Sequence, residues 1–156
     1  MKCKYLIIIG FHIIINIMVY SIDMLFILNI NGECNIAQDY IHYGLVFFLY
    51  FIVGRTFLQK VSLIESAQIV SVIFWINLAL IVSGFMIINT CSPWVNQENG
   101  ILFMFLYNLF NYAVLQKTGH WVDSMIFLDD IIYIFGVTIP SILILLGRLS
   151  YNANEK

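Results

Sequence analysis

Long runs of apolar residues, separated by short polar connectors, dominate this chain. A helix that crosses the hydrocarbon core of a bilayer needs about 20 such residues, within a range of roughly 17–25. Five runs reach or approach this length, and they cover residues 5–30, 40–58, 66–88, 101–116 and 125–147. The pattern predicts an all-α bundle of transmembrane helices that forms a single integral membrane domain over residues 1–156.

The fourth run leaves two arrangements open. Residues 101–116 are near the lower length limit and include Asn108 and Asn111, so they form either a short span or a re-entrant segment. We expect a span, because irregular backbone exposed to lipid has no partner for its polar groups. Five spans are therefore preferred, and four spans plus a re-entrant segment are the alternative.

The composition excludes two large classes of protein. The chain is 62% hydrophobic and only 10% charged, whereas soluble domains are ~45–50% apolar and ~25% charged. A soluble fold would lack polar groups for its surface. The seven Lys and Arg residues are spread thinly, so there is no basic face for nucleic acid. The expected surroundings are the lipid bilayer and a membrane-protein partner or a second copy of the chain.

The positive charges predict an orientation, because Lys and Arg accumulate in cytoplasmic loops. Lys2 and Lys4 precede the first run, and Arg55 and Lys60 follow the second, whereas connectors 31–39 and 89–100 contain neither residue type. We expect a multi-pass protein of the cell membrane with a cytoplasmic N-terminus. Five spans place five positive charges inside and two outside, and four spans place six inside and one outside.

Two ionisable residues lie within the first run. His12 and Asp23 are about three turns apart and share a helix face, so they cannot touch. One interpretation is a neutral His12 bonded to a neighbouring helix and an Asp23 that reaches the bilayer boundary. The other is a polar stripe along a path for protons or solutes, since ionisable groups in the membrane are costly. His42, together with Asp23 and other acidic residues, lies at the same boundary, where a cation or a basic group of a partner would fit as well as solvent.

A second group of ionisable residues surrounds the start of the fifth run: His120, Asp123, Asp129 and Asp130. Acidic residues are favoured at a helix N-terminus, and this explains most of the group without any chemistry. A functional carboxylate is the alternative. No metal-binding spacing such as HExxH is present, so we expect no metal site and no cofactor.

Other residues suggest contacts between segments. Cys34 and Cys91 fall on the outer side, where they form either a disulfide or two free thiols. Small residues that include Ser71, Ala79 and Ser83 recur every four residues along the third run, and Asn108 and Asn111 form part of a polar patch on the fourth. Small and amide side chains let membrane helices approach and bond to one another, so we interpret these residues as helix-packing surfaces.

Residues 130–136, preceded by Gln116 and Gly119-His120, faintly resemble the C-terminal end of VanZ-like membrane proteins. That family carries an Asp, an Asn and a Gly at three-residue steps; here Asp130 and Gly136 match, and Tyr133 replaces the Asn. The acidic residue and the arginine expected around Gln116 are also missing. The resemblance implies an intramembrane enzyme, which we keep only as an alternative.

The sequence contains no catalytic motif and no connector long enough for a soluble domain. It therefore favours a non-enzymatic protein that acts by helix contacts with a partner, as a bacteriocin-immunity protein or an accessory subunit does. The alternatives are a VanZ-like or other intramembrane enzyme, or a small transporter that uses intramembrane His and Asp residues.

Overall fold

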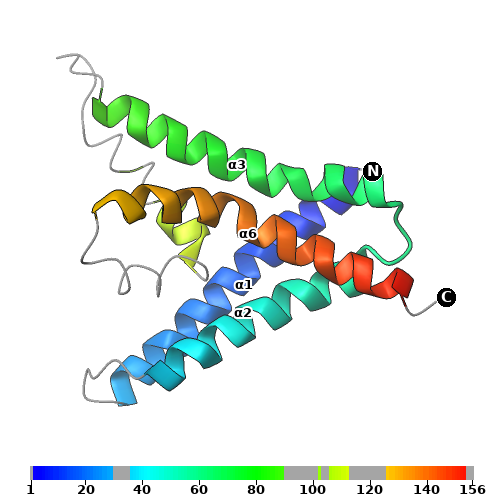
Figure 1. The fold of residues 1–156 in the computed structure, drawn as a ribbon, viewed down its shortest axis with the longest axis horizontal. Coiled ribbons are helices and arrows are strands. Elements are labelled where there is room, and N and C mark those ends of the chain that lie inside the picture. The colour runs from blue at the N-terminus through cyan, green and yellow to red at the C-terminus, as the bar shows by residue number, and fades with distance from the viewer. Residues whose placement is uncertain (1, 30–35, 90–101, 103–105, 113–125, 154–156) are drawn as a thin grey trace.

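A computed structural model describes residues 2–29, 36–89, 102, 106–112 and 126–153 (Figure 1). Most of these residues belong to four long helices: α1 (Lys2–Asn29), α2 (Ile36–Phe57), α3 (Leu63–Asn89) and α6 (Ile126–Ala153). Residues 106–112 form a short, mainly helical segment. No strand occurs in the described part of the chain. The predicted all-α class is confirmed.

Three of the helices are long and apolar enough to cross a membrane, through the stretches Cys3–Leu25, Tyr40–Phe57 and Leu63–Gly84. In α6 the corresponding stretch is shorter, Gly136–Tyr151. Large apolar side chains point outward from all four helices, for example Leu6, Phe48, Ile64 and Ile142. Water would not favour such a surface, and these features support a membrane location.

Two polar contacts fix the direction of the last helix. Lys4 near the start of α1 forms an ion pair of 3.2 Å with Glu65 near the start of α3. Arg148 near the end of α6 donates from Nε and Nη2 to the backbone oxygen of Val61, just before α3, at 2.8 and 2.7 Å. The starts of α1 and α3 and the end of α6 therefore lie at one end of the bundle, where Figure 1 also places both chain termini.

This direction does not confirm the five predicted spans. Five alternating spans would make the last helix parallel to the third, but α6 runs opposite to α3. The chain leaves α3 and enters α6 at the same end of the bundle (Figure 1). Length and composition alone, from which the five spans were predicted, do not determine this direction.

Helices α2 and α6 cross at two glycines. A methyl group added to Gly54 would overlap the backbone carbonyl of Ile144, and one added to Gly147 would overlap the carbonyl of Phe51. Each glycine thus packs directly against the backbone of the other helix. In the membrane the hydrophobic effect does not drive helices together, because lipid tails are as apolar as the side chains. Close packing of the two backbones stabilises the helix pair instead.

The buried apolar core follows from this crossing and contains residues of all four helices. Its members include Ile8, Ile15 and Val19 of α1, Val46, Tyr50 and Val53 of α2, Ile69, Val70 and Ile73 of α3, and Ile144 of α6. Ser141 of α6 also donates from Oγ to the backbone oxygen of Val70 at 3.3 Å. This core therefore joins all four helices, and a smaller cluster of Ile81, Tyr107 and Val137 joins α3, segment 106–112 and α6.

The glycine crossing generates a prediction. Gly54→Ala will lower the stability of the detergent-solubilised protein by about 1–3 kcal/mol, because the added methyl group meets backbone that cannot rotate away. The matched control is Gly44→Ala on the same helix, where nothing lies within 4 Å of an added Cβ, and it will leave stability unchanged or slightly raised. Unfolding in mild detergent, followed by circular dichroism, compares the two variants. Equal midpoints would contradict the close crossing.

Candidate functional site

Polar side chains of α1 and α2 meet inside the bundle, at the position of His12. The ring is 0% exposed, and its Nδ1 lies 2.7 Å from Oη of Tyr50. Asn16, one turn further along α1, donates from Nδ2 to the same hydroxyl oxygen at 3.3 Å and to the backbone oxygen of His12 at 2.8 Å. The three side chains form a buried hydrogen-bonded cluster.

The hydrogen bond between Tyr50 and His12 depends on the tautomer of the imidazole. With the Tyr50 hydroxyl as donor to Nδ1, the ring proton of a neutral His12 lies on Nε2. That nitrogen is buried, lies near the backbone of Phe110, and makes no hydrogen bond of standard geometry to a described residue. The Phe110 ring packs against the imidazole edge to face, with centroids 4.4 Å apart.

A second pair joins the same two helices nearer their other end. Both carboxylate oxygens of Asp23 lie 3.1 Å from Nδ1 of His42, which hydrogen bonds to Oδ1. The side chains are only 10% and 3% exposed. A carboxylate in a membrane interior needs such a partner, because its transfer from water into lipid is unfavourable.

Tyr112 from segment 106–112 lies beside this pair, close enough to Asp23 for electrostatic interaction. Its ring also meets Tyr20 of α1 edge to face, with centroids 5.0 Å apart. Among the described residues, the buried Tyr112 hydroxyl and Oδ2 of Asp23 have no hydrogen bond of their own. The contacts of these two oxygens within the described chain are the 3.1 Å approach of Oδ2 to His42 and the interaction of Tyr112 with Asp23 itself.

Segment 106–112 is attached to α3 by a reciprocal amide pair. Asn77 donates from Nδ2 to Oδ1 of Asn111 at 2.9 Å, and Asn111 donates back to Oδ1 of Asn77 at 2.8 Å. Asn111 also donates to the backbone oxygen of Tyr107 at 3.1 Å. Both amides are 0% exposed, so this pair sets the position of the segment against α3.

The structure brings some of the sequence-predicted residues together and leaves others apart. His12, Asp23, His42 and Asn111 lie in the contacts above, whereas Asn108 is exposed. Ser71 and Ser83 are half-buried and Ala79 is exposed, on the side of α3 away from the core. Asp129 and Asp130 are the fourth and fifth residues of α6, and their side chains are outside the described part of the structure. His120, Asp123, Cys34 and Cys91 lie outside it entirely.

No group of three or more His, Cys, Asp or Glu side chains in the described part of the chain is arranged to hold a metal ion. Asp23 and His42 supply two ligands at most. What the arrangement offers chemically is a set of buried donors and acceptors between α1, α2 and segment 106–112.

Three residues of these contacts were not identified from the sequence. They are Tyr50 and Asn16, which bond to His12, and Asn77, which pairs with Asn111. A signal for Asn16 exists, since it lies one turn after His12 and about two turns before Asp23, on the same face of α1. Tyr50 has no such signal, because a tyrosine in an aromatic run of α2 does not reveal which side chain on another helix it meets.

The amide pair generates a prediction. Asn77→Leu or Asn111→Leu alone will destabilise the protein by about 1–3 kcal/mol, because each removes both hydrogen bonds between the two amides and leaves the remaining buried amide incompletely satisfied. The double variant will lose less than the sum, with a coupling energy of about 1 kcal/mol for two hydrogen bonds in a membrane. Exposed Asn108→Leu is the matched control, with little effect expected. Additive losses in the unfolding measurements would contradict the pair.

Comparisons with known proteins assign no role to any of these residues: no protein-family model, curated protein or solved structure matches the chain. The resemblance of residues 116–136 to VanZ-like proteins therefore stays a prediction from the sequence. Most of those residues also lie where the structure describes no side chains.

Proposed function

We propose that this chain is a multi-pass membrane protein that acts by binding a transmembrane helix of a partner through the outer face of α3. The observation that supports this proposal is the pattern on that face. Small residues recur there every four positions, at 67, 71, 79 and 83, with Trp75 in the gap. The core of the protein uses the opposite face, which carries Ile69, Ile73 and Asn77.

Trp75 adds to the case for a helix partner. Its side chain is 61% exposed, although it lies in the middle of the apolar stretch Leu63–Gly84. Tryptophan is enriched at the two membrane interfaces, where the indole N–H meets water or headgroups. A helix packed over Ala79 and Ser71 would cover the indole and bring polar groups within its reach, which lipid tails do not.

We also infer four spans, α1, α2, α3 and α6, with residues 101–116 as a re-entrant segment. The opposite directions of α3 and α6 support an even number of crossings. The charges agree, since this arrangement leaves six of seven Lys and Arg residues on one side. Non-helical backbone is tolerated at membrane depth where protein buries it, and the Asn77–Asn111 pair supplies such burial.

The four-span arrangement predicts that the N-terminus and the C-terminal end of α6 lie on the same side, the cytoplasm. A fluorescent protein fused after Ala153 will fluoresce in a bacterial host, and alkaline phosphatase fused there will be inactive. Alkaline phosphatase fused within the connector after α1 is the control, with high activity expected. Active phosphatase after Ala153 would restore the five-span arrangement.

A second candidate function is a path for protons or a small solute along α1. The observation that favours it is the buried pair of Asp23 with His42 and the buried His12–Tyr50 contact. His12 lies well inside the apolar stretch Cys3–Leu25, and Asp23 and His42 lie near the ends of their stretches. Ionisable groups within membrane segments commonly mark such paths. A purely structural role explains the same contacts, because each of them joins α1 to α2.

Complementation of a deletion strain separates the two functions. We expect Ser71→Leu and Ala79→Leu to reduce co-purification of the partner by roughly tenfold, equivalent to ~1.4 kcal/mol, and to lose function, because a larger side chain keeps the partner helix away. Gly44→Leu, an exposed small residue on α2, is the matched control. Asp23→Asn and His12→Gln will keep function if the variants fold.

The opposite result is that Asp23→Asn loses function although it folds, while Ala79→Leu keeps function. That result would contradict the helix-contact function and favour the transport function. Folding of each variant is checked by its elution from a size-exclusion column in the same detergent.

A further inference from the structure

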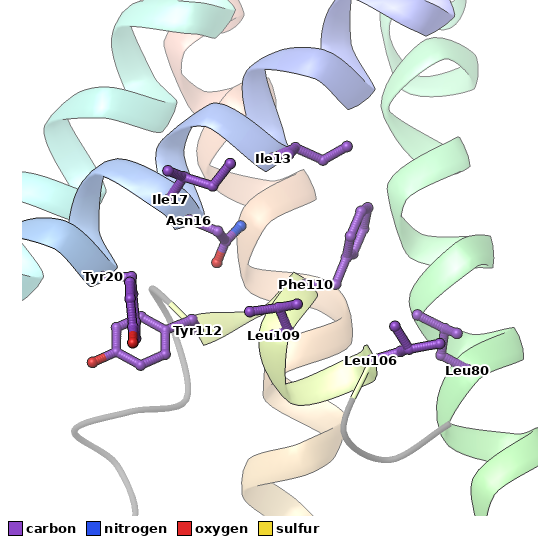
Figure 2. Close-up of a pocket in the computed structure, with 9 residues that line it drawn as sticks. All are labelled: Ile13, Asn16, Ile17, Tyr20, Leu80, Leu106, Leu109, Phe110 and Tyr112. Atoms are coloured by element: carbon purple, nitrogen blue, oxygen red, sulfur yellow. The ribbon is translucent and has the colours of Figure 1, made fainter. Parts of the chain in front are cut away.

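A groove opens toward the lipid between α1, α3 and segment 106–112 (Figure 2). Its volume is about 350 Å³, near the lower end of the ~300–1,000 Å³ typical of ligand pockets. Apart from Asn16 and two tyrosines the lining is aliphatic or Phe: Ile13, Ile17, Leu80, Leu106, Leu109 and Phe110. The lining is thus suited to one apolar chain, not to a polar solute.

The groove runs along α1 for about two turns. It extends along α1 from Ile13 to Tyr20, seven residues or about 10 Å at the helical rise. One leaflet of the hydrocarbon core is about 15 Å deep. Since Ile13 lies near the middle of the stretch Cys3–Leu25, the groove leads from the bilayer centre toward one surface.

The end of the groove nearer that surface is polar. Tyr20 and Tyr112 lie together there (Figure 2), and Asp23 is the next ionisable side chain beyond Tyr20 on α1. The Tyr112 hydroxyl lies beside Asp23, and neither this hydroxyl nor Oδ2 of Asp23 has a hydrogen bond to another described residue, although Oδ2 lies 3.1 Å from Nδ1 of His42. An oxygen pair of this kind, one member a carboxylate, favours a cationic hydrogen-bond donor.

We propose that this groove binds one acyl chain of a lipid whose headgroup carries a primary ammonium, with the ammonium at Asp23 and Tyr112. The chain fills the space between Ile17 and Leu109, where the surrounding medium is itself acyl chain. The depth of the groove, its apolar lining and the charge at its polar end all match a lipid of the leaflet on the Asp23 side. This site is separate from the outer face of α3 that we propose for a protein partner.

Native mass spectrometry of the full chain tests the proposal. The delipidated protein in mild detergent is mixed with dioleoyl phosphatidylethanolamine or with dioleoyl phosphatidylcholine, whose choline has no N–H donor. We expect one bound phosphatidylethanolamine per chain and roughly tenfold less phosphatidylcholine. Equal binding of the two lipids would overturn the role of Asp23 and Tyr112.

Variants locate the lipid. Leu109→Trp and Ile17→Trp fill the groove from opposite walls and will each reduce phosphatidylethanolamine binding about tenfold, and two independent positions guard against one variant that fails to fold. Tyr112→Phe will bring phosphatidylethanolamine binding down to the level of phosphatidylcholine. The control Ile142→Trp, on an exposed position of α6, will bind as the original chain does. Unchanged binding by both groove-filling variants would overturn the site.

A photo-crosslinking residue at position 17 in native membranes separates a lipid from a protein occupant. A lipid adduct supports the proposal, and a discrete protein adduct overturns it. Co-purification of a partner through α3 is measured in the same groove variants. Because the two surfaces differ, variants that lose the lipid but keep the partner test the lipid site alone. A chain that binds the lipid but no partner contradicts only the partner proposal.

Discussion

The absence of water from the bilayer core governs this structure, because every polar group placed there needs a partner within the protein. The chain meets this constraint with pairs that join different elements. His12 bonds to Tyr50, Asp23 to His42, and Asn77 to Asn111. Each pair does more than satisfy its own atoms: the first two set the register of α1 against α2, and the third attaches segment 106–112 to α3. Apolar side chains, which pack equally well against lipid, cannot specify these registers.

Much of the fold follows from the sequence. Runs of about 20 apolar residues predicted the starts of α1, α2 and α3 to within three or four residues and their ends to within one, because helix is the form that satisfies backbone in lipid. The number of spans did not follow. It depends on the direction of α6, and that direction is determined by the Gly54–Gly147 crossing and the Arg148–Val61 contact. Both join residues far apart in the chain, and neither has a local pattern.

The candidate site was predictable in part for the same reason. His12 and Asp23 stood out because ionisable residues in apolar runs are rare, and their shared face was visible from helical spacing. His42 was grouped with Asp23 at one membrane boundary, and the two side chains form a pair. Tyr50, the partner of His12 on α2, was not predicted, because the apolar residues around it do not show which face of α2 meets α1. The groove was also hidden, because it forms only where α1, α3 and segment 106–112 converge. The sequence identifies an ionisable residue that is unfavourable in lipid, and only the packing of the helices identifies the side chain that pairs with it.

The contact between Arg148 and Val61 has a consequence for how the protein is made. The two residues are separated by 87 positions, so α1, α2 and α3 are synthesised before the guanidinium that contacts the turn between α2 and α3. During that interval the surface of α2 that carries Gly54 faces lipid, because α6 is not yet packed against it. Membrane insertion and completion of the bundle are thus separate events in time, and quality-control factors in the bilayer have a period in which an unfinished three-helix intermediate is open to them.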